Sequence, residues 1–420
     1  MDILGLNEKA LKKGHKRTSP DTAELCPACK KNARIYCPHK PILAIKAEMA
    51  KEFDKQNFFG PSPPNLFVGH FGYPSVNWGP MINLDDSLPD NPREWYGWDF
   101  DKIVRARSMQ IRGQANAKVM QAQKSPGFAR QGRENRMLID SQEAAMSCKK
   151  VDIEAHFSKK PSLNVSFHSI HQPMGPSAPL EKLSLAENPK IPKKVDSLVN
   201  EGVRASFAIK ELSAAGYDEN YLCRLLTCGV LGKKDARRLV PTKWGITATD
   251  DMVAKEHIEK IRNFSQANEF LLYFNEYLAN RFWILLMPGA WEYENFEGWM
   301  GAGGNYALNR EYEPFFGRSE YAFKQGGGYY AARLGVCEAL ASSLRRQARV
   351  VVIREILPEY DLPVGVWEIR ENVRHAMKNT PLKFSSKEEI LSYLQKNLKL
   401  PSSAIFSQSA ILRQSRLAEF

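Results

Sequence analysis

Three cysteines and one histidine near the beginning of the chain have the types and spacing of metal ligands. Cys26 and Cys29 form a Cys-x-x-Cys turn, and Cys37 and His39 follow within a stretch of fourteen residues. Such a turn points two thiolates at one ion, and a second pair completes the tetrahedron typical of structural zinc. The expected Zn²⁺ is structural because four protein ligands leave no open position. His15 or an outside residue is the alternative fourth ligand, and a redox pair is the alternative for the Cys-x-x-Cys turn.

The last seven residues carry a second pattern. Gln414, Leu417 and Phe420 recur at intervals of three, which places them on one face of a single helical turn. This spacing resembles the PIP motif, by which replication and repair proteins hold the sliding clamp PCNA. In that mode Leu417 and Phe420 would fill an apolar pocket and Gln414 would hydrogen-bond at its rim. The alternative is a chance match with Phe420 packed on its own domain, and the second aromatic residue that the motif often has is absent.

An excess of basic residues indicates a polyanionic partner. The formal net charge is +12 and the isoelectric point about 9.2, which favours nucleic acid. Between residues 102 and 136 there are nine Lys or Arg against one acid, and residues 100–123 have helical character. A basic helix of this kind could lie along a phosphate backbone, although a solvated face is the simpler alternative. The candidate DNA contacts are Arg105, Arg107, Arg112, Arg133 and Arg136.

No pair of acid–base groups has a spacing that identifies a reaction, so no catalytic residue is assigned. Their convergence in a basic cleft would favour an enzyme acting on nucleic acid or a nucleotide, and their dispersal would favour a non-catalytic adaptor. A glycine run at 326–328 precedes a helical segment. It could cradle a phosphate or simply permit close backbone packing. The dispersed candidates are His70, Asp140, Glu143, Asp250, Asp251, Glu368 and His375.

The hydrophobic pattern predicts a mixed α+β fold with two main domains. Alternation predicts strands at 151–157 and 163–168. Further strands are expected at 349–356 and 364–369, and a turn with a short strand at 241–247. Helical periodicity covers 196–215, 219–230, 250–287 and 331–346, and Ser386 with Glu389 forms a capping box that opens a helix through Leu398. The expected order is a flexible basic arm (1–24), a zinc knuckle (25–45), a larger mixed domain (46–267), a smaller α/β domain (268–400) and a flexible tail (401–420).

The cysteines and apolar runs predict an intracellular, cytoplasmic protein. The 7 cysteines are an odd number, and Cys148, Cys223, Cys228 and Cys337 are scattered, unlike a secreted disulfide framework. The first residues lack the apolar core of a signal peptide. The longest apolar run, near 282–287, is too short to span a bilayer.

Taken together, the chain resembles the archaeal Nre family of DNA repair proteins. The specific stretches are 68–81, 133–145, 172–179, 243–251 and 326–349. The resemblance implies two family domains, a zinc-finger-like N-terminus, a clamp-binding C-terminus and a role in the response to DNA damage, but no established reaction. Members commonly carry four knuckle cysteines, whereas this chain has three and His39. The other hypotheses are a nucleic-acid- or nucleotide-modifying enzyme and an RNA-binding zinc-knuckle protein.

Overall fold

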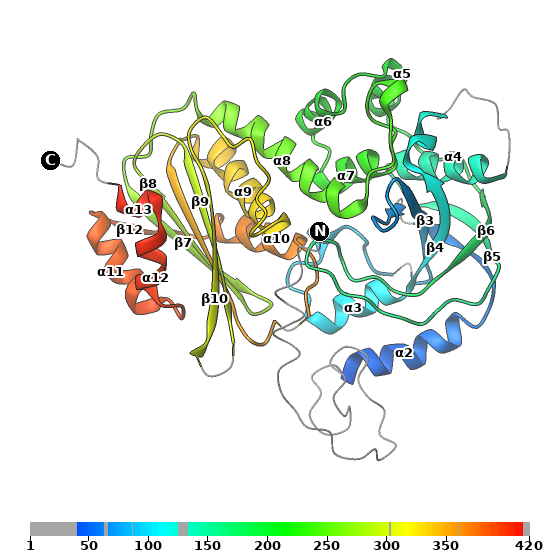
Figure 1. Ribbon diagram of the computed structural model, residues 1–420, viewed down its shortest axis with the longest axis horizontal. Helices are drawn as coiled ribbons and strands as arrows, with labels where there is room; N and C mark the ends of the chain where they lie inside the picture. The colour runs from blue at the N-terminus through cyan, green and yellow to red at the C-terminus, as the bar shows by residue number, and fades with distance from the viewer. Residues whose placement is uncertain are drawn as a thin grey trace, which may run out of the picture.

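A computed structural model describes residues 40–62, 66–85, 87–124, 133–301, 304–360 and 362–414. Two six-stranded sheets, each with its own helices, are joined by a central group of helices (Figure 1). The predicted mixed α+β class is confirmed. None of the described helices is long and apolar enough to cross a membrane.

The first sheet has the strand order β1-β5-β6-β4-β3-β2, and all neighbours are antiparallel except β4 and β6. In β5 the residues Val151, Ile153, Ala155 and Phe157 are buried and alternate with polar neighbours, so the predicted strand at 151–157 is confirmed. The elements of this part are α2 (Lys40–Glu52), β1 (Asn57–Ser62), β2 (Leu66–Val68), β3 (Ser75–Asn83), η1 (Pro92–Glu94), α3 (Phe100–Ser108), β4 (Gln110–Lys118), η2 (Val119–Lys124), α4 (Arg133–Met146), β5 (Val151–Phe157) and β6 (Ser177–Leu185).

A helical layer connects the two sheets. Helix α8 packs against α6 and α7, which belong with the first sheet, and against α9, which belongs with the second. The helical periodicity predicted for 196–215 and 219–230 is confirmed by α5, α6 and α7. The elements are α5 (Lys193–Glu201), α6 (Ala205–Ala214), α7 (Glu219–Thr227), η3 (Lys234–Ala236) and α8 (Thr242–Ile261).

The second sheet is covered on both faces, with α9 and α10 on one side and α11, α12 and α13 on the other (Figure 1). Its order is β10-β9-β11-β8-β7-β12, and the central strand β11 is buried along its whole length. Val350 and Val352 pack in the cluster that contains α9 and α10, whereas Val351 and Ile353 pack with α11, α12 and α13. Because successive side chains point to two apolar faces, the four residues Val350–Ile353 are all apolar.

The remaining elements lie in this second part of the chain. The capping box at the start of α11 is confirmed, since Ser386 accepts a hydrogen bond from the backbone N–H of Glu389. The elements are β7 (Phe270–Tyr277), β8 (Asn280–Met287), β9 (Glu292–Met300), β10 (Tyr306–Glu313), α9 (Gly327–Ala339), η5 (Leu340–Leu344, a π-helical turn), β11 (Arg349–Ile356), α10 (Trp367–Ala376), β12 (Leu382–Phe384), α11 (Lys387–Asn397), α12 (Ser402–Gln408) and α13 (Ala410–Arg413).

Several sequence expectations about these elements are wrong. The helix expected over 100–123 ends at Ser108 and gives way to strand β4, because Gln110–Lys118 pairs with β3. The helix expected over 250–287 ends at Ile261, and 270–287 is a hairpin that pairs β7 with β8. Residues 242–247 begin α8, and residues 367–369 begin α10. Residues 163–168 contribute one isolated bridge, between Ser166 and Met174.

The expected free tail from residue 401 is also wrong in its starting point. Helices α12 and α13 continue the fold to Arg413, and they bury Ile405, Ile411 and Leu412 against the second sheet. The glycine run at 326–328 serves close packing, since a Cβ on Gly328 would collide with the carboxylate of Glu297. Close packing therefore accounts for Gly327 and Gly328, whereas Gly326 has a φ of +53°, which favours glycine.

Candidate functional site

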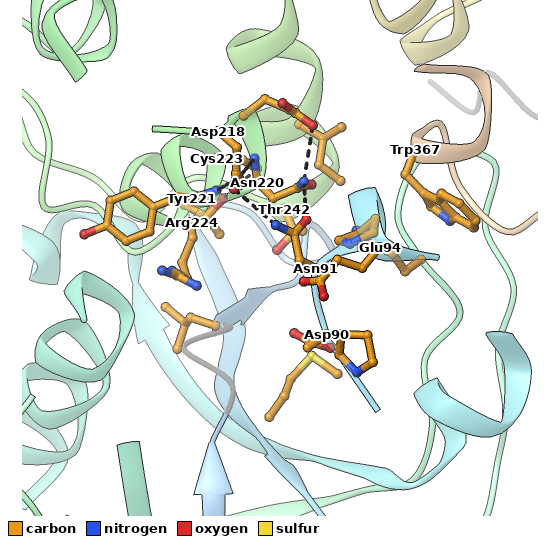
Figure 2. Close-up of a pocket in the computed structure, with 18 of the residues that line it drawn as sticks. Asp90, Asn91, Glu94, Asp218, Asn220, Tyr221, Cys223, Arg224, Thr242 and Trp367 are labelled. Atoms are coloured by element: carbon orange, nitrogen blue, oxygen red, sulfur yellow. Dashed lines mark hydrogen bonds between the residues drawn. The ribbon is translucent and has the colours of Figure 1, made fainter. Parts of the chain in front are cut away.

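A cavity of about 730 Å³ lies where the first sheet, the central helices and α10 meet. Its walls come from β2, β3, the segment around η1, the loop before β6, the beginnings of α7 and α8, and α10. In Figure 2 Tyr221 and Arg224 lie on one side of this space and Trp367 on the other. Concave sites between folded units are the usual places where small ligands bind.

The beginning of α7 is held by a chain of polar side chains. Asp218 caps this helix by accepting hydrogen bonds from the backbone N–H groups of Asn220 and Tyr221, both at 2.9 Å. Asn91 donates from Nδ2 to Oδ2 of Asp218 at 3.1 Å, and Asn220 donates to Oδ1 of Asn91 at 3.0 Å (Figure 2). These contacts fix α7 to the segment around η1.

Glu219, the first residue of α7, is buried among three arginines. Arg374 donates to both carboxylate oxygens at 3.0 Å, Arg370 donates at 3.4 Å, and Arg93 forms a further ion pair. Burial alone would raise the pKa of Glu219, but Arg374, Arg370 and Arg93 together hold it well below the ordinary value. This charge cluster links α7 to α10 and to η1, so it holds three walls of the cavity together.

Asp250 on α8 is buried with one oxygen unsatisfied. Its Oδ2 accepts a hydrogen bond from Arg370 at 2.8 Å, whereas Oδ1 has no hydrogen-bond partner. Burial raises the pKa of Asp250 to about 6 although Arg370 opposes the shift. Burial likewise raises the pKa of Glu368 to about 7 against the effect of Arg354. The folded protein therefore binds protons that the unfolded chain has already released below neutral pH.

These two carboxyl groups predict that stability falls as the pH rises from about 4 toward 7. A raised carboxyl pKa means that the folded state binds more protons than the unfolded state in this window, which gives the free energy of unfolding a negative slope. For Asp250 a shift of about two pKa units corresponds to at most ~3 kcal/mol. Asp250→Asn should remove the contribution of this residue and flatten the slope of the free energy of unfolding against pH, measured by urea titrations at pH 4, 5, 6 and 7. Asp196→Asn, at an exposed position of α5, is the control, and an unaltered slope in Asp250→Asn would contradict this assignment.

The opposite wall contains a second buried ion pair. Arg107 donates from Nη1 to Oδ1 of Asp90 at 2.7 Å and from Nε to the carbonyl of Pro173 at 3.1 Å. The loop that carries Pro173 lies so close to the end of α3 that a side chain does not fit at Gly175. A Cβ there would lie 2.7 Å from the carbonyl oxygen of Arg107. The stretch 172–179 therefore packs against the junction of α3 and β4, and Met174 enters the cavity wall.

Arg224 supplies a cation to the side formed by α7. Its guanidinium lies 4.5 Å from the centre of the Tyr221 ring and donates from Nη2 to the carbonyl of Ser147 at 2.9 Å. Its Nε has no hydrogen-bond partner, and no carboxylate in the described residues forms a salt bridge with it. Lys149 lies exposed at the same rim.

The arginines expected to contact DNA do not form a continuous face. Arg107 is buried in its ion pair, and Arg112 is mostly covered, with its guanidinium 4.7 Å from the centre of the Phe67 ring. Arg105 is exposed but pairs with a glutamate of α2 at 2.6 Å, and Arg136 is exposed on α4. The side chain of Arg133 lies outside the described residues. The expected basic helix is therefore divided between surface and interior.

Among the acid–base groups noted in the sequence, only Asp250 lines the cavity. Asp251 pairs with Arg333 on α9, and the imidazole of His375 stacks on the ring of Tyr96 with a centroid distance of 3.4 Å. The other groups are Glu368 beside Arg354, His70 in the loop between β2 and β3, and Asp140 and Glu143 on α4. This dispersal favours the adaptor over an enzyme built from these groups. Cys223 also lines the cavity, but burial raises the pKa of its thiol to about 12, which disfavours the thiolate that a nucleophile requires.

The predicted zinc ligands and most of the predicted clamp-binding residues lie outside the described residues. These are Cys26, Cys29, Cys37, His39, Leu417 and Phe420. Within the described ranges no group of three or more His, Cys, Asp or Glu side chains could hold a metal ion. Gln414 is described and exposed directly after α13, and its Oε1 lies 3.4 Å from Nη2 of Arg349.

The sequence did not single out most of the residues that shape the cavity. The missed residues include Asn91, Asp218, Glu219, Asn220 and Arg224. A usable signal was the run Asp218-Glu219-Asn220 at the start of the helical periodicity at 219–230, which is typical of an N-cap and an acidic first turn. That signal predicts where α7 begins, but not that three arginines meet there.

Comparison with known proteins gives a consistent family assignment. The family model described as archaeal Nre, N-terminal, matches residues 32–303, and the model for archaeal Nre, C-terminal, matches residues 313–420. DNA repair protein NreA of Archaeoglobus fulgidus is 33% identical over 94% of this chain and 98% of its own length. NreB of the same organism is 31% identical over 91% and 95%, and NreA of Haloferax volcanii is 34% identical over 77% and 78%. No solved structure matches the chain.

Proposed function

This chain belongs to the archaeal Nre family, and we propose that it is a DNA repair factor that a sliding clamp recruits to its site of action. The observation that carries the repair role is similarity along almost the full length of relatives named DNA repair proteins. The regions matched by the two family models include the first sheet, the second sheet except for most of β10, and the walls of the cavity. Survival after DNA damage, with and without the gene, is the experiment that tests this role.

The clamp contact is assigned to Gln414, Leu417 and Phe420. Support comes from the end of the folded part: Ile411 and Leu412 are buried, and Gln414 is exposed one residue after α13. The docking residues therefore follow immediately after the last helix that the second sheet holds. A terminal motif of this kind raises the local concentration of the whole protein at DNA without further contacts.

A structural zinc ion is proposed for Cys26, Cys29, Cys37 and His39. Purified protein should contain one zinc per chain by elemental analysis, and the double variant Cys26→Ser/Cys29→Ser should lose it because two of four ligands are removed. Cys148→Ser, at an exposed cysteine far along the chain, should retain it. A folded wild type without zinc would contradict the site.

Contact with single-stranded DNA is assigned to an exposed aromatic surface made of Phe71, Tyr73 and Trp244. Tyr73 and Trp244 meet edge to face at 5.3 Å, although each is 45% exposed, and Phe71 is 82% exposed. Lys243 lies beside Trp244 in the chain. Aromatic side chains that remain in solvent near cations are typical of surfaces on which unpaired bases stack.

Removing these rings should weaken DNA binding while leaving the fold intact. Tyr73→Ala/Trp244→Ala should lose about tenfold or more in affinity for a single-stranded oligonucleotide, because stacking contributes ~1–3 kcal/mol per base. Tyr306→Ala, which removes another exposed ring (43%) from β10, is the control. Titrations with DNA and RNA of one sequence at one salt concentration separate this proposal from the RNA-binding alternative, since preference for RNA would favour the latter.

A further inference from the structure

We propose that the cavity binds one nucleoside monophosphate unit, with the phosphate at Arg224 and Lys149 and the base against the apolar wall. The proposal goes beyond the repair role and is independent of the clamp contact. The last residue that lines the cavity is Arg370, so the C-terminal segment takes no part in it.

Most carboxylates of the cavity are already occupied by the protein itself. Asp90 is bound by Arg107 and Gln110, and Asp218 by the cap of α7 and by Asn91. Glu219 is surrounded by its arginines. Asp250 is bound by Arg370 through one oxygen and keeps Oδ1 free. Glu94 is exposed and lies away from Arg224 in Figure 2.

The hydrogen-bond donors of the cavity retain spare capacity. Arg224 donates once to a backbone carbonyl, its Nε has no partner, and no carboxylate of the described part pairs with it. Nε of Arg370, on the far wall, is likewise buried without a partner. Lys149 at the rim has no hydrogen bond or ion pair from its ammonium group to another described residue. Arg107 and Arg370 are held in ion pairs, so the donors left for a ligand are those of Arg224 and Lys149, and these favour an anionic ligand.

The size and the apolar wall exclude a simple inorganic anion as the best fit. A phosphate ion would leave most of the 730 Å³ empty, whereas a phosphate joined to a planar base would place apolar surface against apolar surface. Flat rings and flexible sulfur-containing side chains adapt well to such a base. The wall consists of Phe67, Met81, Ile170, Met174, Val366 and Trp367.

Two sources could supply this ligand, and they share its chemistry. One is a free mononucleotide, and the other is a nucleotide turned out of a DNA strand, as enzymes that act on single bases require. In both cases the phosphate would accept hydrogen bonds from the spare donors of Arg224 and Lys149. The experiment therefore needs a free-nucleotide arm and a strand arm.

The free-nucleotide arm is isothermal titration of the full chain with the four deoxynucleoside monophosphates, the corresponding nucleosides and inorganic phosphate. At least one monophosphate should bind at one site per chain. Its affinity should be about tenfold higher than that of its nucleoside or of phosphate, a difference of ~1.4 kcal/mol in binding free energy. Arg224→Gln and Lys149→Gln should each weaken binding about tenfold or more, because each removes a charged donor. Lys378→Gln, at an exposed position just beyond α10, should bind as the wild type does.

The strand arm repeats these variants with a short single strand. Strand binding that is weakened by Arg224→Gln and Lys149→Gln, without binding of any free monophosphate, assigns the ligand to DNA and supports the proposal. The proposal would be overturned if phosphate and nucleotide bound equally well, or if both variants bound nucleotide as the wild type does. It would also be overturned if no free monophosphate bound and neither variant weakened binding of the strand. Lys149 is exposed, so its variant keeps the test valid if Arg224→Gln fails to fold. The variant Leu417→Ala/Phe420→Ala should still bind nucleotide, so failure of the clamp contact and failure of the cavity are distinguishable.

Discussion

Leu417→Ala/Phe420→Ala is expected to reduce affinity for the sliding clamp about 10²-fold to 10⁴-fold while leaving the fold intact. Complete burial of a Leu or Phe side chain contributes ~1.5–3 kcal/mol, so removing both should cost about 3–6 kcal/mol of binding free energy. The melting temperature should not change if the two side chains serve the clamp contact alone. Surface plasmon resonance with immobilised clamp gives the affinity, and circular dichroism gives the melting curve.

The matched control for the tail is Ser415→Ala/Glu419→Ala. It changes two residues of the same segment that lie off the helical face shared by Gln414, Leu417 and Phe420. This variant should bind the clamp within about threefold of the wild type, since it removes no apolar anchor. Equal losses in both double variants would mean that the segment acts through its general composition and not through the motif.

Glu219→Ala is expected to destabilise the fold by about 3–5 kcal/mol, the largest effect on stability that we foresee for a single substitution. Its side chain is 3% exposed, and its carboxylate forms ion pairs with Arg374, Arg370 and Arg93. Removing one partner of a buried ionic cluster leaves uncompensated charge in the interior. The loss should be evident as a lower urea midpoint and as earlier exposure of the cavity walls in hydrogen exchange.

Glu211→Ala provides the comparison for this effect. Glu211 forms an ion pair with Lys194 in which both side chains are 41% exposed, and such a pair contributes at most ~1 kcal/mol. Because the pKa of Glu219 is held low, its stabilising contribution is present above pH 4.5 and disappears as the pH falls below that value. The difference between the two alanine variants should therefore narrow in acid. Similar unfolding energies for both at pH 7 would show that the cluster does not hold the walls together.

The sequence predicted the elements whose pattern has one structural meaning. Strand β5 alternates strictly, β11 contains the apolar run Val350–Ile353, and α11 begins with its capping box. The sequence prediction was wrong where the same hydrophobic pattern fits both a helix and a strand. Aromatic residues in 270–287 fit an apolar helix as well as the β7–β8 hairpin, and only pairing with β11 and β12 selects the hairpin.

The cavity was harder to predict because its parts are distant in the chain. Glu219 and Arg370 are 151 residues apart, and Arg93 and Glu219 are 126 apart. The sequence identified Arg107 as a basic residue but could not show that it is buried in an ion pair with Asp90. The zinc and clamp motifs behave in the opposite way, since their residues are close in sequence and depend on little tertiary context. They remain predictions, to be tested by chemistry on the purified protein.

Survival after DNA damage tests the central claim most directly. The gene is deleted in its host, and the strain is exposed to graded doses of ultraviolet light and, separately, of an alkylating agent. We predict that the deletion strain is more sensitive to damage, that the wild-type gene restores survival, and that Leu417→Ala/Phe420→Ala fails to restore it at equal protein levels. Equal survival of the deletion and parent strains across both treatments would contradict the repair role, and full rescue by the tail variant would contradict recruitment by the clamp.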